Sequence, residues 1–244
     1  MSGPSQGVRR WADLAAVVFA LVFPSLLTWV YFVALRRSPA GLQQTAYAIG
    51  KTIQFVLPVF WVLAIQRRRP GRLRLSASGL AAGLLFGLAV FALGFGLYQG
   101  WLKQAGLFQT AGKQIQEKVV NFGIHGLGAY LALAAFYSLI HSFLEEYYWR
   151  WFVFGQLRGM MPWQAAVGVS SVGFMAHHVI LLATYFGWSS PAVYLFSLGV
   201  AVGGAFWAWL YHHSRSLYGP WLSHLVVDAA IFAIGYDLVQ PLFR

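Results

Sequence analysis

Seven stretches of the chain are apolar over a length that can cross a lipid bilayer. They cover about residues 12–35, 45–65, 79–101, 126–154, 163–186 and 192–211, with the last beginning near residue 219. A membrane-spanning helix needs about 20 mainly apolar residues, which fits these stretches. Pro24 and Pro58 fall inside the first two, and membrane helices tolerate proline where neighbours satisfy the freed carbonyls. The pattern predicts an all-α bundle of about seven membrane helices, with an eighth span or a re-entrant segment left open.

The segment 103–122 is the least hydrophobic stretch between the spans. Ile115, Val119 and Phe122 recur there at helical spacing among charged and amide side chains. This indicates a short helix that either lies in the membrane interface or simply connects two spans. We detect no soluble domain and no repeat, so we expect one integral-membrane domain over residues 1–244. Its motif-bearing core covers about residues 126–240.

The composition agrees with a membrane protein and bears on its partners. Of the 244 residues, 59% are apolar and 9% are charged, whereas soluble domains carry about 25% charged residues. The net charge of +11 lies mainly between the apolar stretches, so it predicts contacts with anionic lipid headgroups and no nucleic-acid binding. The chain has no cysteine, which excludes a disulfide framework, a thiol nucleophile and a thiolate metal site.

The densest basic segment follows the second apolar stretch and predicts the orientation in the membrane. By the positive-inside rule this loop is cytoplasmic. Two spans lie between the N-terminus and the loop, so the N-terminus is expected on the same side of the membrane. We expect the protein in the cell membrane. The arginines of the loop are Arg67, Arg68, Arg69, Arg72 and Arg74.

Two adjacent glutamates and an arginine interrupt the fourth apolar stretch, between His141 and Arg150. A charged side chain at the centre of a membrane helix costs about 2.5–3.5 kcal/mol, so such a cluster needs mutual pairing or a wet cavity. On an α-helix Glu146 and Arg150 can pair, whereas Glu145 shares a face with His141. Arg150 would then neutralise one carboxylate and leave the other for chemistry. The alternative is a helix end at the interface, where Arg150 snorkels to water.

Histidines occur in two of the later apolar stretches. His177 and His178 are adjacent in the fifth, and we expect His177 to be a core histidine that bonds a backbone carbonyl. His224 and Asp228 are four residues apart in the seventh, so the carboxylate is expected to accept the imidazole N–H and orient the ring. A purely structural Asp–His bond is the alternative.

Polar groups on three apolar helices are most simply explained by one shared wet site. Neither Ser142 nor Ser223 has a clear base and orienting group nearby in the pattern, so a serine nucleophile is not indicated. Carboxylates and imidazoles favour activation of water by a carboxylate, with histidines that bind a metal or stabilise an oxyanion. Buried Glu, His and Asp also form proton relays, so a proton-coupled transporter stays open. A non-catalytic membrane protein that binds a prenylated or hydrophobic segment stays open as well.

The three polar groups resemble the motifs of a known protease family. Residues 145–150 match EExxxR, residues 174–178 match FxxxH, and residues 224–228 match HxxxN/D. These are the motifs of the CAAX protease and bacteriocin-processing (CPBP) family of intramembrane proteases, to which the Ras-converting CAAX endoprotease belongs. Upstream of residue 126 only the hydropathy pattern is compatible. The resemblance implies hydrolysis of a peptide bond in a peptide or lipidated-peptide substrate at the membrane.

The resemblance also implies roles for individual residues. Glu145 would be the general base or a ligand, with two charged partners nearby, while two histidines complete the site and one aspartate orients the second histidine. These residues are Glu145, Glu146 and Arg150, then His178 and His224, and finally Asp228. We expect the carboxylate of Glu145 and the imidazoles of His178 and His224 to converge.

The resemblance leaves the cofactor open. Zn²⁺ held by Glu145, His178 and His224 is one possibility. Metal-free activation of water is the other, and we favour it slightly. The chain departs from the family pattern at Trp151, where a small residue is common, and it carries the extra histidines His141 and His177.

Overall fold

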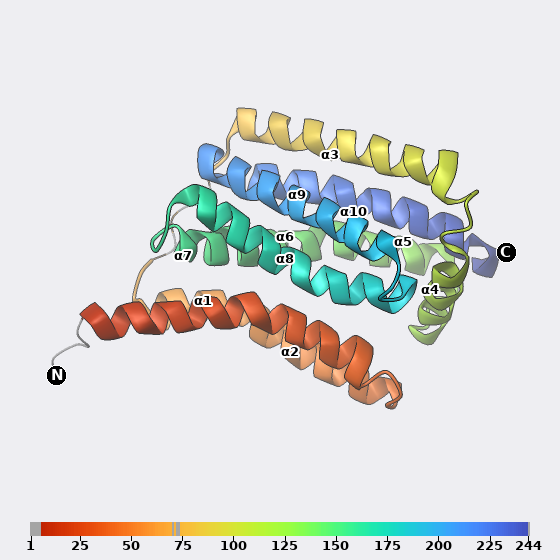
Figure 1. Cartoon of the computed structure of the whole chain (residues 1–244), viewed down its shortest axis with the longest axis horizontal. Helices are drawn as coiled ribbons and strands as arrows, with labels where there is room; N and C mark the ends of the chain where they lie inside the picture. Colours follow the sequence, from red (N-terminus) through yellow and green to blue (C-terminus); the bar gives the residue numbers. More distant parts are fainter. Residues whose placement is uncertain (1–5, 70, 72–73, 244) are drawn as a thin grey trace. The chain divides into compact units, whose positions relative to one another are not determined.

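The computed structural model describes residues 6–69, 71 and 74–243 (Figure 1). All regular elements in these residues are helical, and seven helices are long and apolar enough to cross a membrane. The all-α prediction is therefore confirmed, with seven spans. They are Arg10–Ala34, Ala40–Ile65, Ala77–Leu102, Leu127–Leu157, Trp163–Phe186, Pro191–Ser214 and Tyr218–Phe243. Arg72 of the predicted basic loop lies outside the described residues.

The chain forms two compact units, which comprise residues 1–72 with 147–209 and residues 73–146 with 210–244. The first unit contains α1 (Gln6–Trp29), α2 (Ala40–Phe60), α7 (Gly155–Leu157), α8 (Trp163–Phe186) and most of α9 (Pro191–Ser214). Turns of π-helix extend α1 over Val30–Ala34 and α2 over Trp61–Ile65, and a longer one, Tyr147–Phe154, precedes α7. The expectation of a single domain stays a prediction.

Proline and glycine mark the helix ends of the first unit. Pro191 is the first residue of α9, where the missing N–H costs nothing because it has no helical partner. Gly187 ends α8 with a φ of +82°, a conformation that glycine adopts without strain. α1 packs along α8, and a Cβ on Gly173 of α8 would come within 2.6 Å of Leu21.

Tyr148, which follows the motif glutamates, makes the hydrogen bond that Pro24 prevents within α1. Pro24 has no N–H, so the carbonyl of Ala20, four residues earlier, has no helical donor. The hydroxyl of Tyr148 donates to this carbonyl at 2.8 Å, and Tyr148 is completely buried. The segment after the glutamates is therefore bonded to α1 at the point where the helix lacks its own bond.

The second unit is built around α3 (Ala77–Leu97) and α10 (Tyr218–Val239), which pack along one another (Figure 1). It also contains α4 (Gln109–Asn121), α5 (Leu127–Ala135), α6 (Ser142–Glu146), π-helical turns at Tyr98–Leu102 and Phe136–His141, and a 3₁₀ turn at Gln240–Phe243. The hydroxyl of Ser76 caps α3 by accepting the N–H of Gly79 at 3.1 Å.

Glycines allow α3 and α10 to approach backbone to backbone. A Cβ on Gly83 would overlap the carbonyl of Gly219, and one on Gly87 would lie 3.0 Å from the carbonyl oxygen of Ser223. By contrast, a Cβ on Gly94 of the same helix would meet no atom within 4 Å. The glycine face of α3 therefore supports the part of α10 that carries His224.

The short helix predicted between the third and fourth spans is present as α4. Its buried Val119 joins Ile124, Tyr130 and Val239 in a hydrophobic cluster, while Phe122 is half exposed. The side chain of Gln116 donates to the carbonyl of Leu238 at 2.6 Å. Most of the apolar face of α4 thus packs against its own unit, as in a connecting helix, and its location in the membrane interface stays a prediction.

Candidate active site

The two motif glutamates lie in a helix whose winding changes on both sides of them. The α-helical turn Ser142–Glu146 lies between the π-helical segments Phe136–His141 and Tyr147–Phe154. The hydroxyl of Ser142 donates back to the carbonyl of Ser138 within the first of these segments. Wider π-helical turns change which side chains share a face, and they are frequent at functional sites. The sequence alone predicted one regular helix here.

Glu146 holds the histidine of the seventh span. The Nδ1–H of His224 donates to Oε1 of Glu146 at 2.9 Å, and both side chains are buried. The nearest oxygen of Asp228 is 3.6 Å from Nε2 of the same ring, which is longer than a hydrogen bond. The expectation that Asp228 accepts the imidazole N–H is therefore wrong, because the orienting bond comes from Glu146. Asp228 still faces the ring as a nearby charge.

Glu145 faces two imidazole rings. Its Oε2 is 3.8 Å from Nε2 of His224, and its Oε1 is 3.8 Å from Nε2 of His141, one turn earlier. Glu145 is itself buried, with 4% of its surface exposed. Separations near 3.8 Å exceed a direct hydrogen bond, so Glu145 faces both rings without bonding to either of these nitrogen atoms. The helical spacing correctly placed His141 on the Glu145 face, although His141 was not among the predicted site residues.

The charges of this cluster do not balance. Glu145, Glu146 and Asp228 supply up to three negative charges, whereas His141 and His224 supply at most two positive ones. Two unit charges 4 Å apart interact by about 4 kcal/mol at an effective dielectric constant of 20. Carboxylates and imidazoles that face one another at these separations are the groups that general acid–base chemistry uses.

The remaining motif residues belong to the other unit. Arg150 is completely buried, with its guanidinium carbon 4.9 Å from the Phe174 ring centre and 5.3 Å from that of Trp207. Cation–π contacts of this kind stabilise a buried positive charge. The side chain of Trp151, the bulky residue after Arg150, stacks on Tyr147 at 5.2 Å. The pairing of Glu146 with Arg150, and the convergence of His178 with Glu145 and His224, stay predictions.

The two adjacent histidines of α8 have different environments. Nδ1 of His178 bonds to the carbonyl of Phe174 at 2.9 Å, so a neutral His178 ring donates from Nδ1 and carries its lone pair on Nε2. His177 is the more buried of the two and stacks on Trp149 at 5.8 Å with the rings nearly parallel. His178 thus makes a carbonyl bond of the kind expected for His177, and the bond expected for His177 stays a prediction. On an α-helix, the Nδ1 atom of a histidine can reach the backbone carbonyl four residues earlier. For His178 this is the carbonyl of Phe174, the phenylalanine of the motif.

A comparison with protein families assigns the part of the chain that carries these groups. Residues 127–230 match the family described as type II CAAX prenyl endopeptidase Rce1-like. The match covers 104 of the 244 residues and supports assignment of this segment to the CAAX protease (CPBP) family. The matched residues contain all three motifs, from Glu145 to Asp228, and also His141. Comparisons with curated proteins and with solved structures found no match.

The match to the CAAX protease family raises the question of a metal. The residues that would hold Zn²⁺ are Glu145 and His224 of one unit and His178 of the other. Within residues 6–69, 71 and 74–243, no group of three or more His, Asp and Glu side chains is arranged to hold a metal ion. The metal-free mechanism stays a prediction, and the steps proposed for it use the side chains of the chain and water.

Proposed function

We propose that the chain is an intramembrane endopeptidase in which Glu145 activates water for attack on a peptide bond. The observation that supports this most is the gap between Glu145 and His224, where a buried carboxylate and a buried imidazole face each other at 3.8 Å. A water molecule bound beside these two atoms, rather than between them, would donate one hydrogen to each group. Family membership independently supports a peptidase.

The bond between Glu146 and His224 suits this arrangement of the water. Because Nδ1–H of His224 donates to Glu146, the neutral ring presents the lone pair of Nε2 toward Glu145. Nε2 would accept one hydrogen of the water and Glu145 the other, so a lone pair of the water oxygen is left for the substrate carbonyl. Glu146 acts by orienting the ring, and Glu145 is the general base.

The proposed reaction conserves protons within the site. Glu145 takes a proton as the water oxygen bonds to the carbonyl carbon, and the carbonyl electron pair moves onto its oxygen. Collapse of this tetrahedral intermediate breaks the carbon–nitrogen bond, and the proton on Glu145 passes to the leaving amine. The products are a carboxyl group and an amine, and the enzyme returns to its starting state.

Arg150 and His178, to which the motif resemblance assigns a part in the site, belong to the first unit. Arg150 is charged at every relevant pH, whereas His178 donates through Nε2 only as an imidazolium because Nδ1 is bonded to the Phe174 carbonyl. Their part in stabilising the oxyanion stays a prediction. The carboxylate of Asp228 lies 3.6 Å from His224. Its negative charge offsets positive charge on the histidines of the cluster, so the carboxylate of Glu145 stays available as the base.

The proposed substrate is a peptide anchored at the membrane, with a prenylated C-terminal peptide as the first class to test. The family description names prenyl endopeptidases, and the seven membrane-competent helices support an integral membrane protein. We further propose that the cell membrane holds the chain with its N-terminus in the cytoplasm. Gly71 is exposed and the chain has no cysteine, so Gly71→Cys labelled by an impermeant maleimide in intact cells would contradict this orientation.

The test is hydrolysis of a farnesylated CAAX-tail peptide and its unmodified counterpart by the purified protein in proteoliposomes. Glu145→Gln keeps the shape and removes the proton acceptor, so kcat should fall about 10²–10⁴-fold. The matched control is Glu117→Gln, an exposed glutamate on α4 that should leave kcat unchanged. Full activity of Glu145→Gln would refute its role as base. Proton flux without cleavage by the wild-type protein would identify a transporter instead.

A further inference from the structure

Hydrogen bonds in the first unit tie together three separated segments, each of which carries exposed arginine. The indole N–H of Trp61 and the amide of Gln66 both donate to Oδ1 of Asp13, each at 2.8 Å. The amides of Gln66 and Gln156 exchange two further bonds at 2.9 and 3.2 Å. These contacts join the start of α1, the end of α2 and α7, and we call them the Asp13 node.

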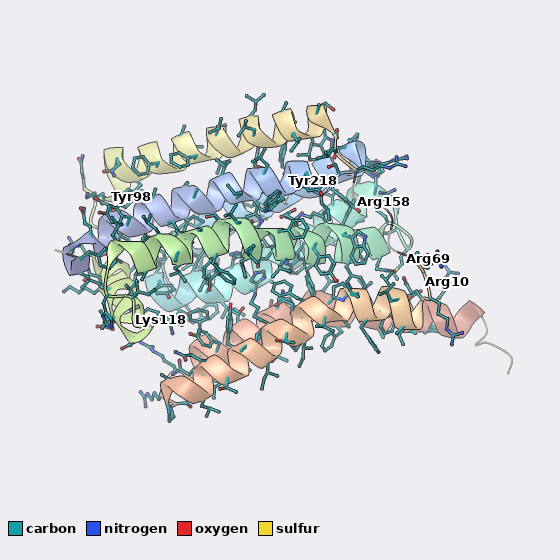
Figure 2. All side chains as sticks on the ribbon, turned by 180° about the vertical axis from the view of Figure 1, so that it is seen from behind. Arg10, Arg69, Tyr98, Lys118, Arg158 and Tyr218 are labelled. Atoms are coloured by element: carbon teal, nitrogen blue, oxygen red, sulfur yellow. The ribbon has the colours of Figure 1, made fainter. Side chains whose placement is uncertain are left out.

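The node brings five arginines to one end of the unit. One lies three residues before Asp13, three directly follow Gln66, and one lies two residues after Gln156. All five are exposed, and Figure 2 shows the three that it labels at the same end. They are Arg10, Arg67, Arg68, Arg69 and Arg158.

The backbone of the central arginines is fixed rather than loose. Arg67 adopts a φ of +54°, a left-handed conformation that usually takes glycine at the end of a helix. The N–H of Arg68 then donates to the carbonyl of Val62 at 2.9 Å, which closes the helix end. A non-glycine residue held in this conformation points to a functional constraint. Here the fixed backbone sets the positions from which the arginine side chains extend into the surroundings.

The positive charge of this end is not neutralised within its own unit. Asp13 is the sole carboxylate side chain in residues 1–72 and 147–209, and its Oδ1 is already bonded by two neutral donors. Among the described residues, no ion pair joins the five arginines to an acid. Guanidinium groups bind phosphate through two parallel hydrogen bonds, so several at one surface favour a phosphate-bearing partner.

We propose that the five arginines around the Asp13 node form a binding site for the headgroup of an anionic phospholipid. The site lies where two spans, Arg10–Ala34 and Ala40–Ile65, have adjacent ends, which is the level of lipid headgroups. The sequence alone predicted contacts of the basic residues with anionic headgroups in general and used Arg67 to Arg74 as a topology signal. The fold adds which arginines gather, because it brings Arg10 and Arg158 from distant segments. The proposal is independent of the proteolytic function.

The test is native mass spectrometry of the full-length protein in detergent, titrated with phosphatidylglycerol and separately with phosphatidylcholine. We expect preferential retention of phosphatidylglycerol, weakened about fivefold in Arg68→Gln and in Arg158→Gln. The matched controls are Arg36→Gln and Arg37→Gln, exposed arginines beyond the other end of the same span, which should leave binding unchanged. Equal losses in test and control variants would overturn the proposal in favour of unspecific charge attraction.

Two further variants distinguish the effect of the hydrogen bonds in the Asp13 node from the effect of charge. Gln156→Leu removes the amide pair without changing the charge and should weaken phosphatidylglycerol binding, with thermal unfolding measured to exclude global loss of structure. Asp13→Asn keeps an acceptor for Trp61 and Gln66, so it should retain or tighten binding. Unchanged binding in folded Gln156→Leu would refute a site organised by the node. Displacement of phosphatidylglycerol by millimolar inorganic phosphate would show a site for free phosphate instead.

Discussion

The bond between Tyr148 and the Ala20 carbonyl allows a test in which one mutation should compensate another. Pro24 deprives this carbonyl of its helical donor, and the Tyr148 hydroxyl replaces it at 2.8 Å in a fully buried place. Tyr148→Phe removes the hydroxyl and leaves the carbonyl buried without a donor. Such an unsatisfied group costs about 1–3 kcal/mol.

Pro24→Ala restores the backbone N–H that can bond to Ala20. In the wild-type background it adds a second donor to a carbonyl that has two lone pairs, so the change in stability should be small. In the Tyr148→Phe background it supplies the missing donor, so the double variant should recover most of the lost stability. The expected coupling energy is about 1–2 kcal/mol, within the range for residues in direct contact.

The assay is the free energy of unfolding in mixed micelles for the wild type, both single variants and the double variant. Tyr194→Phe is the matched control, because Tyr194 makes the same type of bond to the Trp188 carbonyl at 3.0 Å but is exposed. Its loss should be smaller than that of Tyr148→Phe. If the double variant is as unstable as the sum of the single variants, Tyr148 does not replace the helical bond and the reasoning fails.

Three further predictions concern the second unit. Glu146→Gln should lower kcat less than Glu145→Gln does, because the amide oxygen still accepts Nδ1–H of His224 but without charge; equal loss in peptide cleavage would mean that the two roles cannot be divided. Gly83→Ala should destabilise the fold by about 1–3 kcal/mol in the same unfolding assay, since its Cβ overlaps the Gly219 carbonyl, whereas Gly94→Ala should change stability by less than about 1 kcal/mol. Dialysis against a chelator should leave peptidase activity intact, and loss of activity that Zn²⁺ restores would overturn the metal-free mechanism.

The sequence by itself determined the spans and singled out the residues of the candidate site. A helix that crosses lipid must satisfy its own backbone and be apolar for about 20 residues, so hydropathy alone predicts seven spans. The cost of charge in lipid singles out Glu145, Glu146 and Arg150 without any knowledge of the fold. Helical periodicity correctly places His141 beside Glu145, because residues four apart share a face.

Only the tertiary structure decided which groups bond to one another. Glu146 and His224 are 78 residues apart, and helical periodicity offered Asp228 as the nearer partner for the imidazole. Gly83 and Gly94 look alike in sequence, yet only Gly83 meets the backbone of α10. Tyr148 and Ala20 are 128 residues apart. Such pairs depend on how helices pack, and packing is set by side-chain shape along whole helix faces rather than by the local pattern of apolar and polar residues.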